Sequence, residues 1–365
     1  MVTSKKVFQA AGISLLIILF LPCQVYAQSA ETPVPDGFYL VSSAPGVNLY
    51  QKDYSGGSPD FVQVVDLSQG ARLVTMFGDI SLLRPGKGAY GGNDARIQAQ
   101  SLQKFWKQLT ARFDDAFCVF NGQFFYMPES PTRLPFPLKV GGEIITDGYG
   151  LNEFPENKLI LELWSDKANI RPLTQESLYL STAPDVIGGL TQTANKRSDR
   201  YVGRTFIGID DRNLDGASEI VLIFNSRLSR QVDAANILGQ FGADEVMMLD
   251  GGGSAQLICQ GKVLVSSDRA IPQAFGVVAA SESSLIMPGS LDSVAGDDFP
   301  PGPEITPTPS DAIDTQMVPK EEEPISPIEE SAQLQFNFGY VIWVPVLMTP
   351  VAAILFFFVG KFRFG

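Results

Sequence analysis

The 365-residue chain contains no histidine. Its absence excludes a Ser-His-Asp or Cys-His catalytic site, and it excludes zinc sites that need imidazole ligands. Acid–base chemistry on this chain must therefore use carboxylates, tyrosine or lysine.

Basic residues are scarce: 27 Lys and Arg stand against 40 Asp and Glu, which gives a formal net charge of −13. Most of the excess lies between residues 288 and 330, where 11 acids accompany a single base, Lys320. This proline- and acid-rich composition predicts a disordered, self-repelling stalk over 288–335. The remainder is close to neutral and shows no basic patch, which argues against nucleic-acid binding.

Cysteine is also rare, with three residues in the chain. Cys23 falls in a predicted signal peptide, so two cysteines remain, Cys118 and Cys259. An even number in an oxidising compartment is typical of a disulfide. Each of the two lies close to one of the glycine motifs described below, so a disulfide is one interpretation and two buried thiols are the other.

The two ends of the chain predict membrane targeting. Residues 1–27 read as a secretory signal peptide, with lysines before an apolar run and a small residue, Ala27, at the cleavage point. An uncleaved anchor is the alternative. Residues 338–360 form a second apolar run, long enough to span a bilayer, and the short tail 361–365 carries two basic residues. Since basic residues stay cytoplasmic, we expect a single-pass cell-membrane protein with its C-terminus inside and its globular part extracytoplasmic. A removable lipid-anchor signal is the weaker interpretation.

Residues 36–285 read as one globular domain of α+β class, a mixed sheet with packed helices. Apolar spacing at three and four residues predicts helices over 95–113, with Asn93 or Asp94 as its cap, and over 229–241. Between them, short apolar runs predict strands.

The most informative motif follows a short apolar strand at 245–248. The strand leads into an acid, three glycines and a serine: Asp250, Gly251, Gly252, Gly253 and Ser254. Three glycines in a row expose backbone N–H groups and let a ligand approach the main chain. This layout favours a site for an anionic or sugar-like ligand, whereas a tight turn with a capping serine is the structural alternative.

Two further motifs place polar side chains at predicted strand ends. Asn121 and Gly122 follow the apolar run 116–120, and Arg204 and Thr205 begin the run 204–210. If the three strand ends converge, they bring a carboxylate, an amide and a guanidinium suited to phosphate into one pocket. The alternatives are a turn at Asn121 and a surface salt bridge at Arg204.

These motifs, in this order, resemble the phosphodiester glycosidase family, which shows similar Asn-Gly-Gly-Phe-Phe, Arg-Thr and Leu-Asp-Gly-Gly-Gly-Ser sequences. The resemblance covers roughly residues 60–280 and departs at Gln123, which replaces a glycine and is expected to narrow the pocket or change the substrate. It implies cleavage of a sugar from a phosphodiester-linked partner, here in envelope or exopolysaccharide metabolism. A non-catalytic carbohydrate-binding surface module is the alternative.

We expect Asp250 to act as nucleophile or general base, Asn121 to belong to the catalytic group, and Arg204 to hold the phosphodiester. The amides of Gly251 to Gly253, with Ser254, would bind the sugar or a phosphate oxygen, and Gly122 and Thr205 complete the predicted binding site. A second carboxylate is common in glycosidases, and the candidates are Asp147 and Asp210. No cofactor is required for this chemistry.

One segment matches the first half of a calcium-binding loop, with oxygen-bearing side chains at alternate positions before a glycine: Asp211, Asn213, Asp215 and Gly216. The twelfth position is Leu222, so the usual bidentate glutamate is missing, and Glu219 is a candidate substitute. The sequence therefore leaves two interpretations, a calcium site and a plain Asp-Gly hairpin turn.

Overall fold

The computed structural model describes residues 32–281. The predicted signal peptide (1–27), stalk (288–335), transmembrane helix (338–360) and tail (361–365) lie outside the described residues. Within residues 32–281, no helix has the length and apolar character needed to cross a membrane.

The larger of the two main sheets has eleven strands. Its path runs through β1 (Tyr39–Ala44), β2 (Val47–Lys52), β3 (Asp60–Asp66), β14 (Ile220–Ser229), β13 (Val202–Asp210), β15 (Glu245–Met248), β12 (Asp185–Thr191), β10 (Lys158–Leu163) and β11 (Ala168–Pro172). Off this path, β8 (Leu138–Val140) pairs with β12 and with β9 (Glu143–Thr146).

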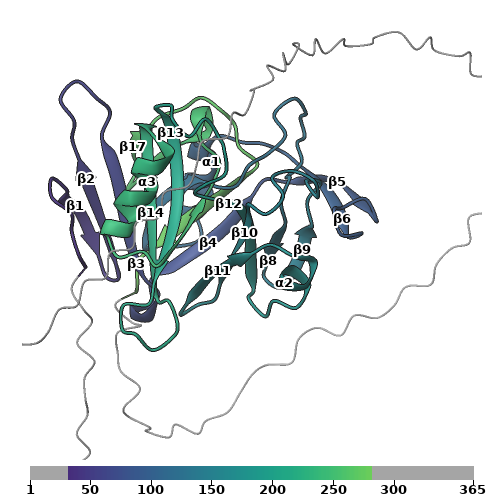
Figure 1. Ribbon diagram of the computed structural model, residues 1–365, viewed down its shortest axis with the longest axis horizontal. Helices are drawn as coiled ribbons and strands as arrows, with labels where there is room; N and C mark the ends of the chain where they lie inside the picture. The colour runs from purple at the N-terminus through teal and green to yellow at the C-terminus, as the bar shows by residue number, and fades with distance from the viewer. Residues whose placement is uncertain (1–31, 282–365) are drawn as a thin grey trace, which may run out of the picture. The chain divides into compact units, whose positions relative to one another are not determined.

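The second sheet has five strands, in the order β17 (Lys262–Val265), β16 (Leu257–Cys259), β7 (Ala116–Asn121), β18 (Gln273–Val278) and β4 (Arg72–Phe77). A separate hairpin joins β5 (Ile80–Pro85) to β6 (Asn93–Ile97), and Figure 1 shows it at the far end from β1 and β2.

The predicted mixed sheet is wrong, because every pairing between the described strands is antiparallel. Antiparallel strands can be joined by tight turns, whereas parallel strands need long crossovers. The domain is accordingly mostly β, and the described residues hold three short α-helices: α1 (Leu102–Thr110), α2 (Gln175–Tyr179) and α3 (Gln231–Gln240).

Three of the four apolar clusters in residues 32–281 lie in layers around the two sheets, and the fourth is a small one around Ile160 and Leu178. Phe61, Ile207 and Ile223 of the large sheet pack with Phe120 and Phe275 of the small one, so the main core lies between the sheets. Helix α3 covers the other face of the large sheet, in front of β13 and β14 in Figure 1, and α1 covers the other face of the small sheet. Both faces of the central strands are therefore buried, which explains their nearly continuous apolar sequence.

The two predicted helices are shorter than expected. Helix α1 begins only after Ser101, whose side chain accepts a hydrogen bond from the Lys104 backbone N–H. The preceding residues, including Ile97, belong to strand β6, and Ile97 exchanges backbone hydrogen bonds with Thr132. The predicted start of this helix at residue 95 is wrong, because non-local strand pairing overrides the local apolar spacing.

Cys118 and Cys259 form a disulfide. They are directly opposed in the pairing of β7 with β16. Of the two interpretations left by the sequence, the structure supports the bond. A disulfide of this kind is typical of an oxidising compartment and therefore indicates an extracytoplasmic domain.

Candidate active site

The three predicted motifs meet where the two sheets adjoin. Asn121 ends β7 in the small sheet, and its Nδ2 donates to the backbone carbonyl of Asp250, 2.7 Å away. Asp250 follows β15, and its own backbone N–H donates to the carbonyl of Gly122 at 3.1 Å. The Thr205 hydroxyl, on β13, donates to Asn121 Oδ1 at 2.7 Å. The structure thus brings together residues that are up to 129 positions apart in the chain.

The side chains of Asn121 and Thr205 are buried, and their hydrogen bonds are made to other groups of the protein. Asn121 Oδ1 also accepts from the backbone N–H of Gln256, and Thr205 accepts from Asn225, whose Oδ1 accepts a long bond from Gln63. Buried polar groups need such partners, because an unpaired one costs about 1–3 kcal/mol. These side chains therefore hold the strand ends in place, and Asn121 positions Asp250.

The glycines after Asp250 are required by close packing. A Cβ on Gly251 would lie 2.6 Å from the carbonyl oxygen of Gly203, and one on Gly203 would lie 2.1 Å from that of Gly252. Gly252 also has a φ of +60°, in the left-handed region that favours glycine. The glycine loop can therefore lie directly against the start of β13, and it carries Asp250 and Ser254 with it.

This loop lines a cavity of about 560 Å³. Asp250 is half-buried there, and its Oδ1 accepts the backbone N–H of Gly251 at 2.9 Å. Burial raises the pKa of the Asp250 carboxyl to about 6, although hydrogen bonds from Ser254 and Gly251 and the charges of Arg269 and Lys196 oppose the rise. The group is thus a carboxylate at neutral pH with a basicity well above that of an ordinary aspartate.

Arg204 makes different contacts from those expected of a phosphate clamp. Its guanidinium is buried and donates four hydrogen bonds to backbone carbonyl oxygens, those of Lys196, Arg197, Arg200 and Ser229. A guanidinium has five N–H groups, so four are already engaged. Burial also lowers its pKa. Its main effect is to fix the segment 196–200 beside the cavity.

Besides Arg204, three cations line the cavity, namely Lys196, Arg269 and the exposed Arg197, and the motif search missed all of them. Lys196 and Arg269 line it, and Arg269 Nη1 donates to the Ser254 hydroxyl at 3.2 Å. The Lys196 ammonium lies 4.7 Å from the ring centre of Phe124 and 4.5 Å from that of Phe154. These two cations lie on loops without a recognisable motif, and their proximity in sequence to Arg204 and Ser254 is the only feature that could have indicated them.

The cavity also contains a second carboxylate, that of Glu153, on an exposed loop. The two predicted candidates lie elsewhere. Asp147 Oδ2 accepts backbone N–H groups from Tyr90 and Gly92, so it holds a neighbouring loop. Asp210 is paired with Arg212 at the opposite end of β13 from Arg204, about 20 Å away at the usual rise of a strand.

Gln123 does not narrow the cavity, contrary to expectation. Its side chain is buried, and its Nε2 donates to the backbone carbonyl of Pro137 at 3.0 Å. The neighbouring Gly122 is needed for space, because a Cβ there would lie 1.5 Å from Gln273 Oε1, which accepts the Gln123 backbone N–H. Gln123, the residue that departs from the family motif, is therefore buried inside the protein and does not line the cavity.

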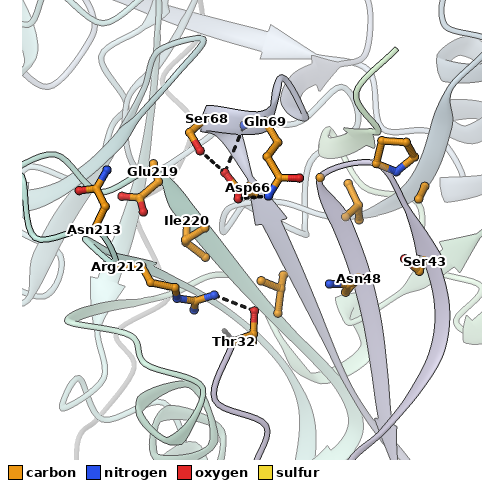
Figure 2. Close-up of a pocket in the computed structure, with 15 residues that line it drawn as sticks. Thr32, Ser43, Asn48, Asp66, Ser68, Gln69, Arg212, Asn213, Glu219 and Ile220 are labelled. Atoms are coloured by element: carbon orange, nitrogen blue, oxygen red, sulfur yellow. Dashed lines mark hydrogen bonds between the residues drawn. The ribbon is translucent and has the colours of Figure 1, made fainter. Parts of the chain in front are cut away.

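A larger cavity, of about 810 Å³, lies away from Asp250, where residues of the predicted calcium loop meet the start of the large sheet (Figure 2). Its charged groups are largely engaged. Figure 2 shows Asp66 bonded by Ser68 and Gln69, and the Arg212 guanidinium directed at the Thr32 hydroxyl. We therefore place the candidate active site in the smaller cavity.

The side chains of the predicted calcium loop accept hydrogen bonds from the loop itself. The two carboxylate oxygens of Asp211 accept the backbone N–H groups of Asp215 and Gly216, and Asn213 Oδ1 also accepts that of Asp215. Across residues 32–281, no group of three or more His, Cys, Asp or Glu side chains is arranged to hold a metal ion. Calcium binding stays a prediction, which calorimetric titration would test.

Comparisons with known proteins bear on the same residues. Residues 118–278 match the family model of the phosphodiester glycosidases. The catalytic domain of zebrafish N-acetylglucosamine-1-phosphodiester alpha-N-acetylglucosaminidase, auto-inhibited by its pro-peptide, is similar in structure, with 14% identity, a TM-score of 0.46, and coverage of 69% of this chain and 88% of that one. A hypothetical protein from Synechocystis follows, with 13% identity, a TM-score of 0.37, and coverage of 67% and 69%. No curated protein sequence matches the chain.

The matched range spans all three motifs, from Asn121 to Ser254, as well as both bonded cysteines. The family resemblance drawn from those motifs is therefore confirmed. This chain carries a domain of the phosphodiester glycosidase family, a family of hydrolases.

Proposed function

We propose that this domain hydrolyses the bond between the anomeric carbon of a sugar and a phosphodiester oxygen, outside the cytoplasm and tethered by the predicted C-terminal helix to the cell membrane. The observation that carries the proposal is the joint placement of Asp250, Lys196 and Arg269 around one cavity. A carboxylate suits the anomeric carbon, and the two cations suit the phosphate.

The two cations meet the needs of a diester substrate. A phosphodiester carries one negative charge, and that charge grows on the leaving oxygen as the bond to carbon breaks. Lys196 is held over two aromatic rings, and Arg269 is held against Ser254. Cations fixed in this way stabilise developing negative charge without reorganising during the reaction.

Asp250 is proposed as the nucleophile or general base. The C1–O bond breaks, its electron pair leaves on the phosphate oxygen, and water adds at C1 with loss of a proton, which yields the free sugar and a phosphomonoester. A phosphate is a good leaving group, so a strong general acid is unnecessary. Glu153 is the second carboxylate available in the cavity, and it is our candidate for the base that receives a proton from water.

Asn121 and Arg204 have positioning roles in this scheme. Asn121 holds the backbone of Asp250, and Arg204 fixes the segment that presents Lys196. The glycine loop and Ser254 form the floor beside the sugar. The proposed reaction needs no cofactor. We propose envelope or exopolysaccharide material as the source of its substrate.

The test is release of sugar from a panel of sugar-1-phosphodiesters, including UDP-N-acetylglucosamine, by wild type, Asp250→Asn, Lys196→Met and Arg269→Met. We expect release by wild type, none by Asp250→Asn, and raised KM with lowered kcat in the two cation variants. Asp166→Asn, which changes an exposed turn residue, is the matched control and should be unaffected.

The pH profile adds a second readout. Because the pKa of Asp250 is about 6, kcat/KM should fall as the pH drops below about 6. Full activity of Asp250→Asn would overturn the assignment. No release from any substrate, together with saturable binding of one, would instead support a non-catalytic carbohydrate-binding module.

A further inference from the structure

A separate cavity of about 470 Å³ lies on the α3 side of the large sheet, where β3 and β13 begin and β14 ends. Its walls include two tyrosines, two carboxylates and two amides: Tyr54, Tyr201, Asp60, Asp233, Asn236 and Gln240. The active site described above uses none of them.

The two tyrosine rings are exposed but held in place. Tyr54 is 43% exposed and Tyr201 is 58% exposed. The Tyr54 hydroxyl donates to Asp60 Oδ2 at 2.8 Å, and Asp60 is buried beneath it. The Arg230 guanidinium lies 5.4 Å from the ring centre of Tyr201 and is itself fixed by two 2.8 Å hydrogen bonds to Asp233. Two preorganised aromatic surfaces therefore face solvent in one hollow.

The carboxylate under Tyr54 is that of Asp60, which is buried in the protein. Burial raises the pKa of Asp60, and the nearby Ser226 hydroxyl and the Tyr54 hydroxyl offset part of that effect. Asp60 Oδ1 is buried and accepts no hydrogen bond from any residue within 32–281. Keeping a buried aspartate to orient an exposed tyrosine is costly for the fold, which indicates that the tyrosine has a role at the surface.

The amides complete a hydrogen-bonding edge. Asn236 and Gln240 are four residues apart on α3, so they lie on the same face of the helix. Both are exposed, and neither side-chain amide bonds to any residue within 32–281. Each offers donors and an acceptor to a ligand. Most of the other polar groups of the cavity are already paired with the protein.

The cavity shares a wall with the active site. Tyr201 lines it, whereas the next residue, Val202, lines the cavity of Asp250. Ser229 lines it as well, and the Ser229 carbonyl accepts a hydrogen bond from Arg204 at 3.2 Å. The chain around Tyr201 and Val202 therefore forms the boundary between the two hollows.

We propose that this cavity is a second saccharide-binding subsite, which takes a neutral sugar unit of an oligosaccharide or glycan. The apolar face of a sugar ring would stack on Tyr201 or Tyr54, and its hydroxyls would bond to Asn236 and Gln240. The carboxylates of Asp60 and Asp233 disfavour an anionic unit. Lys52 also lines the cavity, but its ammonium donates to the Asp36 backbone carbonyl and lies 5.9 Å from the Tyr54 ring centre. This site stands on its own geometry, so it can hold or fail independently of the proposed hydrolysis.

Binding is measured on the full-length chain carrying Asp250→Asn, so that no substrate is turned over. The probes are chitotetraose and maltotetraose, followed by saturation-transfer NMR and calorimetry. We expect saturable binding of at least one probe. Tyr201→Ala should remove the stacking surface and Asn236→Ala a hydrogen-bonding group, and each should weaken binding about fivefold, which corresponds to about 1 kcal/mol.

Tyr201→Phe separates stacking from hydroxyl contacts and should keep most of the affinity. Tyr39→Ala removes another exposed tyrosine, on β1 outside the cavity, and should change nothing. Binding that survives both Tyr201→Ala and Asn236→Ala, or binding of neither tetrasaccharide, would overturn the proposal. Loss of hydrolysis in Asp250→Asn, with tetrasaccharide binding intact, would support both assignments separately.

Discussion

Replacing Asp250 by asparagine should stabilise the protein at neutral pH while it removes the proposed catalytic group. Asparagine has nearly the shape of the protonated aspartate but cannot ionise. The substitution therefore measures what it costs the fold to keep a charged carboxylate in the active-site cavity. Enzyme sites that hold strained or desolvated groups commonly show such a trade-off between stability and activity.

The magnitude follows from the pKa of Asp250, which burial raises from 3.8 to about 6. Each pKa unit is worth about 1.4 kcal/mol, so ionisation costs the folded state about 3 kcal/mol relative to the unfolded chain. The sign is fixed by proton binding. Between pH 3.8 and 6 the folded state binds more protons than the unfolded state, so this group lowers stability as the pH rises through that range.

The advantage of Asp250→Asn over wild type should therefore depend on pH. It should be below about 1 kcal/mol at pH 4, about 2 kcal/mol at pH 5, and about 3 kcal/mol at pH 7.5, where it levels off. Urea denaturation of both proteins at these three values measures it, with Asp166→Asn as the exposed control. The same samples should show no sugar release by the Asp250 variant.

An advantage that is absent at pH 7.5, or that does not change between pH 4 and 7.5, would refute the reasoning. Either result would mean that the carboxylate is not desolvated in the folded state. Its elevated basicity, and with it the proposed role as nucleophile or base near neutral pH, would then lose its physical support.

Three further substitutions test how the site is held. Gly203→Ala should lower kcat/KM at least tenfold with the fold intact by circular dichroism, because its Cβ would lie 2.1 Å from the Gly252 carbonyl oxygen and displace the glycine loop. Arg204→Lys should lower the free energy of unfolding by at least about 2 kcal/mol and raise KM, since an ammonium cannot replace four carbonyl contacts; an unchanged urea midpoint would contradict this. Cys118→Ala, which opens a link to Cys259 across 141 residues, should cost about 2–5 kcal/mol by urea denaturation under oxidising conditions.

The sequence suggested the three strand ends as one possible pocket because each motif combines an apolar strand with residues that have few other uses. Asn121 and Asp250 follow buried strands, and glycines beside them allow main chains to approach closely. Such local combinations are visible without the fold. The family motif added the order and spacing, and the match over residues 118–278 confirms the family.

The roles of individual side chains were harder to predict, because they depend on neighbours from distant segments. Arg204 looked like a phosphate ligand, but the backbone of 196–200 occupies most of its guanidinium. Lys196 and Arg269 lie on loops, and nothing in their local sequence shows which way a loop turns. Asp147 does not line the active-site cavity, because its carboxylate is bonded to backbone N–H groups of a loop more than 50 residues earlier in the chain.

The position of the site between the two sheets explains the buried polar chain that runs through it. Asn121 belongs to the small sheet and Thr205 to the large one, so the hydrogen bond between them crosses from one sheet to the other. Asn225, also in the large sheet, donates to Thr205 and supports that bond from behind. Apolar contacts alone would fix the distance between the sheets but not their register, because such contacts are non-directional.

The directional hydrogen bonds of Asn121 fix how the two sheets are aligned and so hold Asp250 in position. The disulfide acts on the same strand, since Cys118 lies three residues before Asn121 and ties β7 to β16. Any change that lets β7 slide should therefore reduce activity before it unfolds the domain. Asn121→Ala is the direct case: it should lower kcat far more than it raises KM, because the cavity and its cations remain while the carboxylate is displaced.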